Sequence, residues 1–229
     1  METMALTRDS RQSSLVPPER LAEVTPIVIG VGAVGRQVAW QLAAVGVSRL
    51  HLFDDDAVAV ENLAPQGYSP HDLGEAKVVA TAAWCGQLRP DLGVMAHPER
   101  FARSTAKSLN DLAKPAVFLC VDSIATRRVI WNSVRHMAPF VVDGRMAAEV
   151  VRVLASDRPP LDGHYSSTLF GAGDAYVGAC TARSTIYAAT IAAGLMVAQF
   201  ARWLRGIPVV ADQTLNLLAA ELTVNEPAR

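Results

Sequence analysis

The sequence predicts an α/β protein with a mostly parallel sheet, helices on both faces of that sheet and a long crossover loop before a C-terminal helix. Two observations lead to this prediction. Short apolar runs rich in β-branched residues alternate with segments of helical periodicity along most of the 229 residues, a pattern typical of parallel sheets. The first apolar run also ends in a glycine-rich loop, which favours a tight strand-to-helix turn.

The predicted elements follow a polar N-terminal segment, residues 1–20, that we expect to be a mobile arm before a single domain of residues 21–229. Strands are predicted where apolar and β-branched residues run together, over Thr25–Ile29, Arg49–Phe53, Gly93–Ala96, Ala116–Val121, Phe140–Val142, Glu149–Ala155 and Leu215–Leu222. Helices are predicted where apolar residues recur at helical spacing, over Arg36–Val45, Lys77–Leu88, Ser104–Leu112, Ala125–His136 and Ala182–Leu204.

The stretch from Ser156 to Gly178 has a different composition, because it contains Pro159, Pro160 and several glycines. These residues predict a long irregular loop. Loops of this length inside a compact domain are usually functional or mobile, so the segment is a candidate for binding a partner.

Composition excludes several classes of protein. Apolar residues make up 51% and charged residues 19%, which excludes a disordered chain. Lys+Arg is 21 against 22 for Asp+Glu, so no excess of positive charge is present for a nucleic-acid partner. The most apolar stretch, Ile186–Phe200, is interrupted by polar residues and is too short to span a bilayer. We therefore expect a cytoplasmic protein with neither a membrane nor a nucleic-acid partner.

The first loop has the pattern G-x-G-x-x-G between a predicted strand and a predicted helix. Its candidate ligand-binding residues are Gly30, Gly32, Ala33 and Gly35. Glycines there let the backbone approach a phosphate, which the helix N-terminus attracts. Asp54 ends the next strand, where a carboxylate can bind ribose hydroxyls. The pattern predicts nucleotide binding without separating NAD from ATP; a tight turn that only serves packing is the alternative.

Further motifs follow in chain order. They are Asp54-Asp55-Asp56-Ala57-Val58, Glu61-Asn62-Leu63-Ala64-Pro65-Gln66, Asp72-Leu73-Gly74-Glu75-Ala76-Lys77, and Val121-Asp122-Ser123 followed by Arg127 and Asn132. With Arg8-Asp9-Ser10-Arg11-Gln12 near the start, this series resembles the ThiF/MoeB/HesA family, bacterial relatives of the ubiquitin-activating enzymes. The family pattern is D-x-D-x-V, N-L-x-R-Q, G-x-x-K and an aspartate after the fourth strand. The resemblance covers the chain from Arg8 to about Leu222 and implies a Rossmann-like fold.

The resemblance implies an ATP-dependent adenylyltransferase. Family members bind ATP·Mg²⁺ and activate a C-terminal carboxylate, which implies a small ubiquitin-like or sulfur-carrier partner ending in Gly-Gly, and a homodimer. Carried over by position, Asp54 holds the ribose, Ala33 packs on the nucleotide by its backbone, Asn62 and Lys77 face the phosphates, Asp122 binds Mg²⁺, and Arg11 reaches the ATP of a second subunit. The remaining nucleotide-binding candidates are Asp56, Gln66 and Ser123.

Simpler interpretations stay open for two of these residues. Lys77 at a helix start is compatible with a solvated surface lysine. Asp122, taken alone, is better explained as the N-cap of the next helix. The chemistry still agrees with the resemblance, because adenylation needs fixed cations and donors around the phosphates more than a protein nucleophile.

The sequence departs from the family pattern at Pro65, which stands where N-L-x-R-Q has its arginine. Proline supplies neither charge nor an N–H donor, and a lost contact of this type costs on the order of 10²–10³ in rate. Arg36, Arg127 and Arg145 are candidate replacements.

Cysteine usage is the second departure. Only Cys85, Cys120 and Cys180 are present, and none are spaced as a pair, so we predict no structural zinc. Cys180 lies where the family carries its acyl-accepting cysteine. A cysteine near a helix N-terminus and beside Arg183 is activated as a nucleophile, so Cys180 joins Arg11, Lys77 and Asp122 as a catalytic candidate. A structural role at the helix start remains equally open.

Three functions follow in order of preference. The first is adenylation of a partner's C-terminal carboxylate, with or without a thioester at Cys180. The second is a non-catalytic subunit or scaffold, which Pro65 supports. The third is an NAD-dependent oxidoreductase, which rests on the glycine loop and Asp54 alone and leaves Arg11 and Lys77 unexplained.

Overall fold

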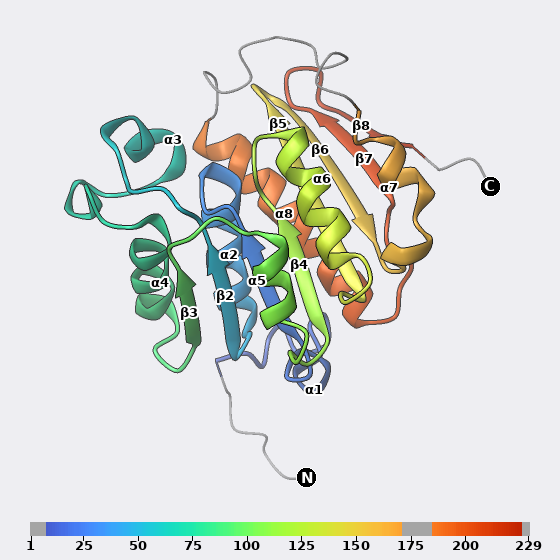
Figure 1. Ribbon diagram of the computed structural model, residues 1–229, viewed down its shortest axis with the longest axis horizontal. Helices are drawn as coiled ribbons and strands as arrows, with labels where there is room; N and C mark the ends of the chain where they lie inside the picture. The colour runs from blue at the N-terminus through green and yellow to red at the C-terminus, as the bar shows by residue number, and fades with distance from the viewer. Residues whose placement is uncertain (1–7, 171–184, 226–229) are drawn as a thin grey trace.

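Eight strands form one sheet in the computed structural model of the chain, which describes residues 8–170 and 185–225 (Figure 1). Their order is β3-β2-β1-β4-β5-β6-β7-β8. The strands are β1 (Thr25–Ile29), β2 (Arg49–Phe53), β3 (Gly93–His97), β4 (Pro115–Leu119), β5 (Phe140–Ala147), β6 (Val150–Ser156), β7 (Asp212–Asn216) and β8 (Glu221–Val224).

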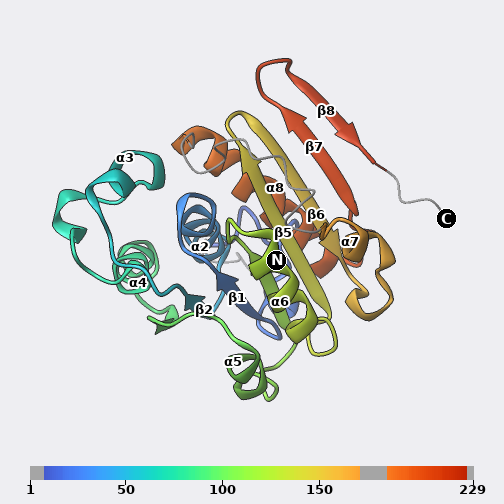
Figure 2. The same ribbon diagram turned by 45° about the horizontal axis from the view of Figure 1, so that its top comes forward.

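The helices connect these strands and cover both faces of the sheet. They are α1 (Pro18–Leu21), α2 (Ala33–Val45), α3 (Leu63–Gln66), α4 (Lys77–Leu88), α5 (Arg103–Ser108), α6 (Ile124–Val134), α7 (Gly163–Ser167) and α8 (Ile186–Leu204). Figure 2 shows α2, α4 and α8 on one face and α5, α6 and α7 on the other. The predicted fold class is thereby confirmed.

Two apolar cores hold the three layers together. Phe118 and Phe200 meet edge to face at 5.5 Å beneath α8, and Trp131 of α6 is buried against the opposite face. Each such side chain contributes about 1.5–3 kcal/mol by leaving water. The rigid sheet that results fixes the loops at its two edges.

The parallel half of the sheet brings its strand ends to one level. Strands β3, β2, β1, β4 and β5 pair with one another in parallel. The pairs β5–β6, β6–β7 and β7–β8 are antiparallel. Ile29 at the end of β1 lies opposite Phe53 of β2 and Leu119 of β4. The residues that follow these three positions therefore emerge together at the carboxyl edge of the sheet.

Residues 8–20 differ from the mobile arm that we expected. Val16 is 8% exposed and Leu21 of α1 is 4% exposed, so this segment contributes to the core. Asp9 also forms an ion pair with Arg89 at 2.7 Å. These contacts involve few residues, so the polar composition of the segment did not predict them.

Predictions for the antiparallel half are less accurate. The single strand predicted over Leu215–Leu222 is wrong, because the chain turns between β7 and β8, with Ala220 at a φ of 53°. The expected loop from Ser156 contains a short helix, α7, and its part beyond residue 170 lies outside the described residues. Among the described residues, α8 is the longest helix, and none has the length and apolarity needed to cross a membrane.

Candidate functional site

The glycine loop between β1 and α2 contains three glycines with different roles. Gly30 has a φ of 87°, which favours glycine. A Cβ on Gly35 would lie 1.8 Å from the carbonyl oxygen of Gly30, so only glycine fits there. A Cβ on Gly32 would meet no described atom closer than 3.9 Å. Packing against the described residues therefore does not require Gly32, and these residues leave space beside it at the start of α2.

Asp54 follows β2 and closes one side of this space. Its carboxylate accepts the backbone N–H of Val31 at 2.7 Å and that of Asp56 at 2.9 Å. Burial raises the pKa of Asp54, although the two N–H donors oppose that shift. Asp54 is thus fixed against the glycine loop, close to the N-terminus of α2.

Lys77 is the first residue of α4 and is not a solvated surface lysine. Its side chain is 7% exposed and its Nζ lies 2.7 Å from Asp56 Oδ2, whereas the side chain of Asp56 is 65% exposed. The ammonium group is therefore fixed beside the acidic end of β2. A phosphate at this place would compete with Asp56 for the lysine.

Asp54, Asp55 and Asp56 are the one group of three potential metal ligands in residues 8–170 and 185–225. Asp54 and Asp56 already bind Val31 and Lys77, and Asp55 pairs with exposed Arg100 at 3.6 Å. These partners explain the cluster without an ion.

The Asn62–Gln66 segment lies next to the loop. Asn62 Oδ1 accepts the N–H of Ala59 at 2.9 Å, so this side chain stabilises its own turn. Gln66 Oε1 is buried and has no hydrogen-bond donor among the described residues. A Cβ on Gly32 would lie 3.9 Å from that oxygen. A buried acceptor without a donor is costly, and this oxygen borders the space that the described residues leave beside Gly32.

Pro65 lies in the short helix α3, and the candidate replacement arginines are all engaged elsewhere. The guanidinium of Arg36 stacks on the rings of Tyr68 and Trp84, at 3.9 and 4.4 Å from their centres. Burial lowers the pKa of Arg36.

Arg127 and Arg145 both pair with the fully buried Asp143. Burial, and then the neighbouring Arg145, lower the pKa of Arg127 to about 10. The missing arginine of the family pattern is therefore not replaced by any of these three side chains within the described residues.

Asp122 and Ser123 follow β4 at the same edge of the sheet. Ser123 is the N-cap of α6, because its hydroxyl accepts the N–H of Thr126 at 3.4 Å. The capping explanation for Asp122 is therefore wrong, and its carboxylate is exposed. Because β2, β1 and β4 are neighbours spaced by about 4.8 Å, the ends of β2 and β4 lie about 10 Å apart, on either side of the glycine loop. Asp54 and Asp122 follow these two strand ends.

Tyr68 is a site residue that the sequence did not reveal. Its hydroxyl donates to the carbonyl of Val31 in the glycine loop at 2.7 Å. Burial raises its pKa to about 12. Tyr68, on which Arg36 stacks, thus supports the glycine loop. In the sequence, only the position of Tyr68 after the turn at Gly67 indicated this role.

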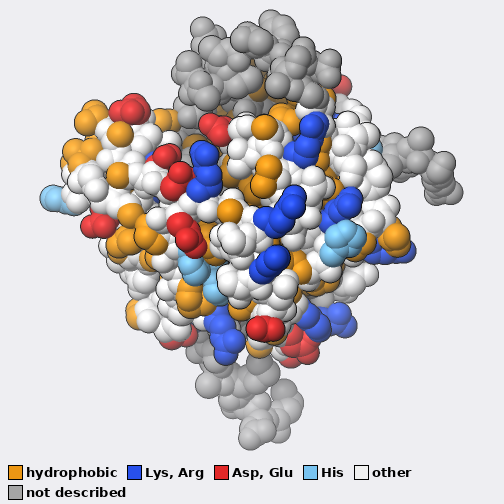
Figure 3. Space-filling model, viewed as in Figure 1, with side chains coloured by type: hydrophobic (Ala, Val, Ile, Leu, Met, Phe, Trp, Pro, Cys, Tyr) orange, Lys and Arg blue, Asp and Glu red, His pale blue; other side chains and the backbone are white. Residues whose placement is uncertain are grey.

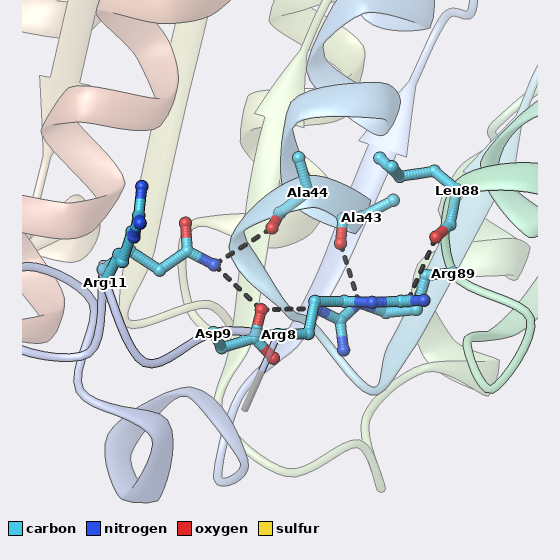
Figure 4. A pocket seen from close by; sticks show the side chains of 8 residues that line it. Arg8, Asp9, Arg11, Ala43, Ala44, Leu88 and Arg89 are labelled. Carbon is cyan, nitrogen blue, oxygen red and sulfur yellow. Dashed lines mark hydrogen bonds and ion pairs between the residues drawn. The ribbon is translucent and has the colours of Figure 1, made fainter. Parts of the chain in front are cut away.

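Arg11 lies at the opposite edge, in a cleft of about 330 Å³ where α2 and α4 end (Figure 4). Helix α2 has 13 residues and is about 20 Å long, so Arg11 is far from the glycine loop of its own chain. Figure 4 shows Arg11 apart from the bonded group, and its side chain is exposed.

The other polar side chains of this cleft cap helix C-termini. Arg89 Nε donates to the Ala43 carbonyl at 2.9 Å and Gln12 Nε2 to the Ala44 carbonyl at 3.1 Å. Arg8 donates to the carbonyl of Leu88 at 3.0 Å. The N-terminal segment is therefore fastened to both helices.

The three cysteines lie in different environments. Cys85 is buried in α4, and burial raises its pKa to about 12, which makes it an unreactive core residue. Cys120 is partly buried behind the glycine loop. Cys180 and its neighbour Arg183 lie outside the described residues.

Charge is unevenly distributed over the face that carries α5 and α6. Figure 3 shows Lys and Arg side chains over the region of α6 and several Asp and Glu side chains toward α3. The exposed basic residues include Arg128 of α6. Negatively charged ligands are therefore favoured on the α6 side of the glycine loop.

A strand, a glycine loop, a helix N-terminus and an acid after the next strand form the arrangement that is typical of nucleotide sites in Rossmann-like α/β folds. More specifically, the chain belongs to the ThiF family, whose model matches residues 10–228. It is 34% identical over 122 residues to ubiquitin-like modifier-activating enzyme 5 of Bombyx mori, covering 49% of this chain and 31% of that protein. It is 36% identical over 135 residues to adenylyltransferase and sulfurtransferase MOCS3 of Sus scrofa, covering 55% and 29%. The matches thus span less than a third of either relative.

Solved structures share the fold. The crystal structure of PaaA superposes with a TM-score of 0.76 at 22% identity, over 96% of this chain and 68% of that one. Escherichia coli MccB with ATP gives 0.71 at 15% identity, over 98% and 72%. Escherichia coli tRNA N6-threonylcarbamoyladenosine dehydratase, TcdA, gives 0.68 at 18% identity, over 87% and 94%. At these identities the likeness shows the fold alone.

Proposed function

We propose that this chain is an ATP-dependent adenylyltransferase that activates the C-terminal carboxylate of a small ubiquitin-like or sulfur-carrier protein ending in Gly-Gly. The observation that carries the proposal is the space that the described residues leave beside Gly32, next to the buried Gln66 oxygen, which has no hydrogen-bond donor among those residues, with Asp54 and Asp122 following the neighbouring strands. Membership of the ThiF family and the printed names of the two relatives support it.

The proposed reaction joins the partner to AMP. An oxygen of its terminal carboxylate attacks the α-phosphorus of ATP, the bond from that phosphorus to the bridging oxygen breaks, and pyrophosphate leaves with the electron pair. The chain supplies fixed charges and donors rather than a nucleophile for this step.

Each carboxyl-edge residue has a proposed role. Asp54 accepts from the ribose hydroxyls, with Asp56 beside it, while the N–H groups of Gly32, Ala33 and Gly35 face the nucleotide. The N–H of Gly30 donates to the Phe53 carbonyl at 2.8 Å, so Gly30 serves the turn of the loop instead. The buried Gln66 oxygen is an acceptor for a donor on the ligand, and Asn62 and Ser123 complete the rim. Lys77 exchanges Asp56 for phosphate oxygens. Hard carboxylate oxygens suit Mg²⁺, so exposed Asp122 is the residue that would hold it, and the bound ion would offset phosphate charge.

A homodimer follows from the place of Arg11. A side chain about 20 Å from its own glycine loop cannot contact the nucleotide there. Arg11 is also exposed, whereas Arg8, Gln12 and Arg89 are engaged in capping helix ends. We infer that Arg11 completes the site of a second copy and stabilises charge on the phosphates.

The proposed organisation is an adenylation domain of residues 21–229 preceded by a segment, residues 1–20, that carries Arg11. Within this scheme, Cys180 is an acceptor for the activated acyl group, with AMP as the leaving group. The metal is Mg²⁺, with no zinc, because the three cysteines include no pair at zinc-ligand spacing. The proposed location is the cytoplasm, where ATP is available for this reaction.

The test is ATP–pyrophosphate exchange with a small carrier protein ending in Gly-Gly, compared with the same carrier lacking both glycines. We expect exchange only with the intact tail, and loss of exchange in Asp122→Asn. Cys180→Ala should keep exchange but lose any adduct that reductant removes. Absence of exchange with every Gly-Gly carrier tried would overturn the proposal.

A second candidate is a nucleotide-binding subunit without activity of its own. The engagement of Arg36, Arg127 and Arg145 by other partners favours it, because none of these three then replaces the arginine missing at Pro65. Pro65→Arg discriminates the two. Gain of exchange only in this variant would favour the inactive subunit, whereas exchange that is already present in the wild type would exclude it.

A further inference from the structure

One arginine side chain joins the residues that follow β4, directly before Asp122, to the middle of β5. Backbone pairing of the two strands stops before Val121 and Gly144. Beyond that point, Nη2 of Arg127 donates to the carbonyl of Val121 and, at 3.2 Å, to the carbonyl of Gly144. The side chain thus continues the link between the strands after the backbone ladder has ended.

Asp143 fixes the orientation of this guanidinium group. The Asp143 carboxylate is fully buried, and its Oδ1 pairs with Arg127. Its Oδ2 accepts Nε of Arg145 at 2.8 Å and the hydroxyl of Tyr165 at 3.1 Å. Because Arg127 is 4% exposed and meets acceptors from two strands, it has little freedom to move.

Stability alone does not explain this cluster. Buried ion pairs seldom stabilise a fold more than apolar side chains of similar volume. Two arginines on one carboxylate also leave a buried excess of positive charge. Arg127 lies in the first turn of α6, where side chains point back toward the helix N-terminus, and so it reaches the turn at Asp122.

We propose that Arg127 is a positioning residue for the metal–nucleotide site, because it fixes the Val121 carbonyl and with it the direction in which Asp122 leaves β4. This inference rests on the function proposed above, in which Asp122 holds the metal. Arg145 shares Asp143 but bonds Thr168 instead of the Val121 carbonyl, so it is a matched control.

The test measures binding of Mn²⁺ in the presence of ATP by electron paramagnetic resonance, on the full chain. Arg127→Lys keeps the charge on Asp143 but loses the fork that reaches Val121 and Gly144. We expect it to weaken Mn²⁺ binding about tenfold, as loss of a residue that orients a metal ligand typically does. Arg145→Lys should stay within about twofold of the wild type, and Asp122→Asn should lose the site.

If Arg127→Lys does not fold, Arg127→Gln is the second variant. It leaves Asp143 and Arg145 as a charge-balanced pair. Equal weakening in the Arg127 and Arg145 variants, or no weakening in either, would overturn the positioning role while Asp122→Asn still upholds the site. A wild type that binds no Mn²⁺ with ATP would overturn the proposed function and this inference together. In an Asp122→Asn background, Arg127→Lys should have no further effect on Mn²⁺ binding.

Discussion

Polar groups differ between the amino edge of the sheet, where the parallel strands begin, and the carboxyl edge, where they end. At the amino edge, Arg8, Gln12 and Arg89 donate to the last carbonyls of α2 and α4, so the helix ends are capped. At the carboxyl edge, the Gln66 oxygen is buried without a described donor and Asp122 is exposed. Within the described residues, folding therefore satisfies the polar groups of one edge and leaves those of the other incomplete, as the proposed binding site requires. Arg11 is the exception at the amino edge, and the proposed dimer gives it a role.

The largest expected effect tests whether the two edges belong to one shared site. Arg11→Ala and Asp122→Asn should each lower ATP–pyrophosphate exchange by about 10²–10³, since each removes a charge near the reacting phosphates. A mixture of the two inactive variants should recover exchange, because a mixed dimer has one site with both residues intact; random pairing gives about a quarter of wild-type activity.

The control for this experiment is Arg20→Ala, which removes another exposed arginine from the N-terminal segment. It should leave exchange unchanged. Recovery that fails although the variants form mixed dimers would place Arg11 and Asp122 in the same subunit's site, and would break the comparison of the edges.

A pair of glycine substitutions separates folding from binding at the carboxyl edge. Gly35→Ala forces a methyl group to within 1.8 Å of the Gly30 carbonyl and should destabilise the fold by about 3 kcal/mol. Gly32→Ala meets no described atom closer than 3.9 Å and should change the free energy of unfolding by less than about 0.5 kcal/mol. It should nevertheless weaken ATP binding. Chemical denaturation and calorimetry measure the two effects, and an equal loss of stability in both variants would contradict the distinction.

Much of the parallel half could be predicted from the sequence, and the reasons are local. Thr25–Ile29 and Arg49–Phe53 are compact apolar runs that are buried by both helical layers, and the predicted bounds are those of β1 and β2. The helix predicted over Lys77–Leu88 is α4. Periodicity is a strong signal where an element packs along its whole length.

The rest depended on contacts that no local pattern records. Strand β5 continues through Asp143 to Ala147, although charged residues end the apolar run after Val142, because Arg127 and Arg145 neutralise the buried acid. The exposed hairpin of β7 and β8 turns at Leu217–Ala220 without glycine or proline, so its turn was not recognised. The engagement of Arg36 by aromatic rings was likewise hidden.

A smaller, pH-dependent effect is expected at the middle of β2, where neither edge is involved. Burial, and then the neighbouring His97, lower the pKa of His51 from 6.5 to about 4. Between these values the unfolded chain binds a proton that the folded chain does not, so stability falls as the pH falls from 6.5 to 4. The loss attributable to His51 is at most about 3 kcal/mol.

Denaturation of His51→Leu at several pH values checks this sign. The variant should lose less stability than the wild type over that window, whereas His71→Leu, at an exposed position, should behave as the wild type does. ATP binding at constant pH should be unaffected by His51→Leu. An unchanged slope in His51→Leu would show that another group titrates.

The smallest effect concerns the attachment of the N-terminal segment. Arg89→Ala removes a helix cap and the ion pair to Asp9 and should cost about 1–3 kcal/mol of stability. It should lower exchange in the presence of Arg11 but not in an Arg11→Ala background, and should leave ATP affinity intact. Arg100→Gln, which loses only an exposed pair, is the control. Additive losses in the double variant would argue against a role through Arg11.

The central claim is that the incomplete carboxyl edge is an ATP site, and calorimetric titration with ATP·Mg²⁺ and, separately, with NAD tests it most directly. The account predicts binding of ATP, no binding of NAD, and an affinity for ATP that falls on the order of tenfold in Asp122→Asn. Binding of NAD instead of ATP, or ATP binding that neither Asp122→Asn nor Gly32→Ala weakens, would contradict it.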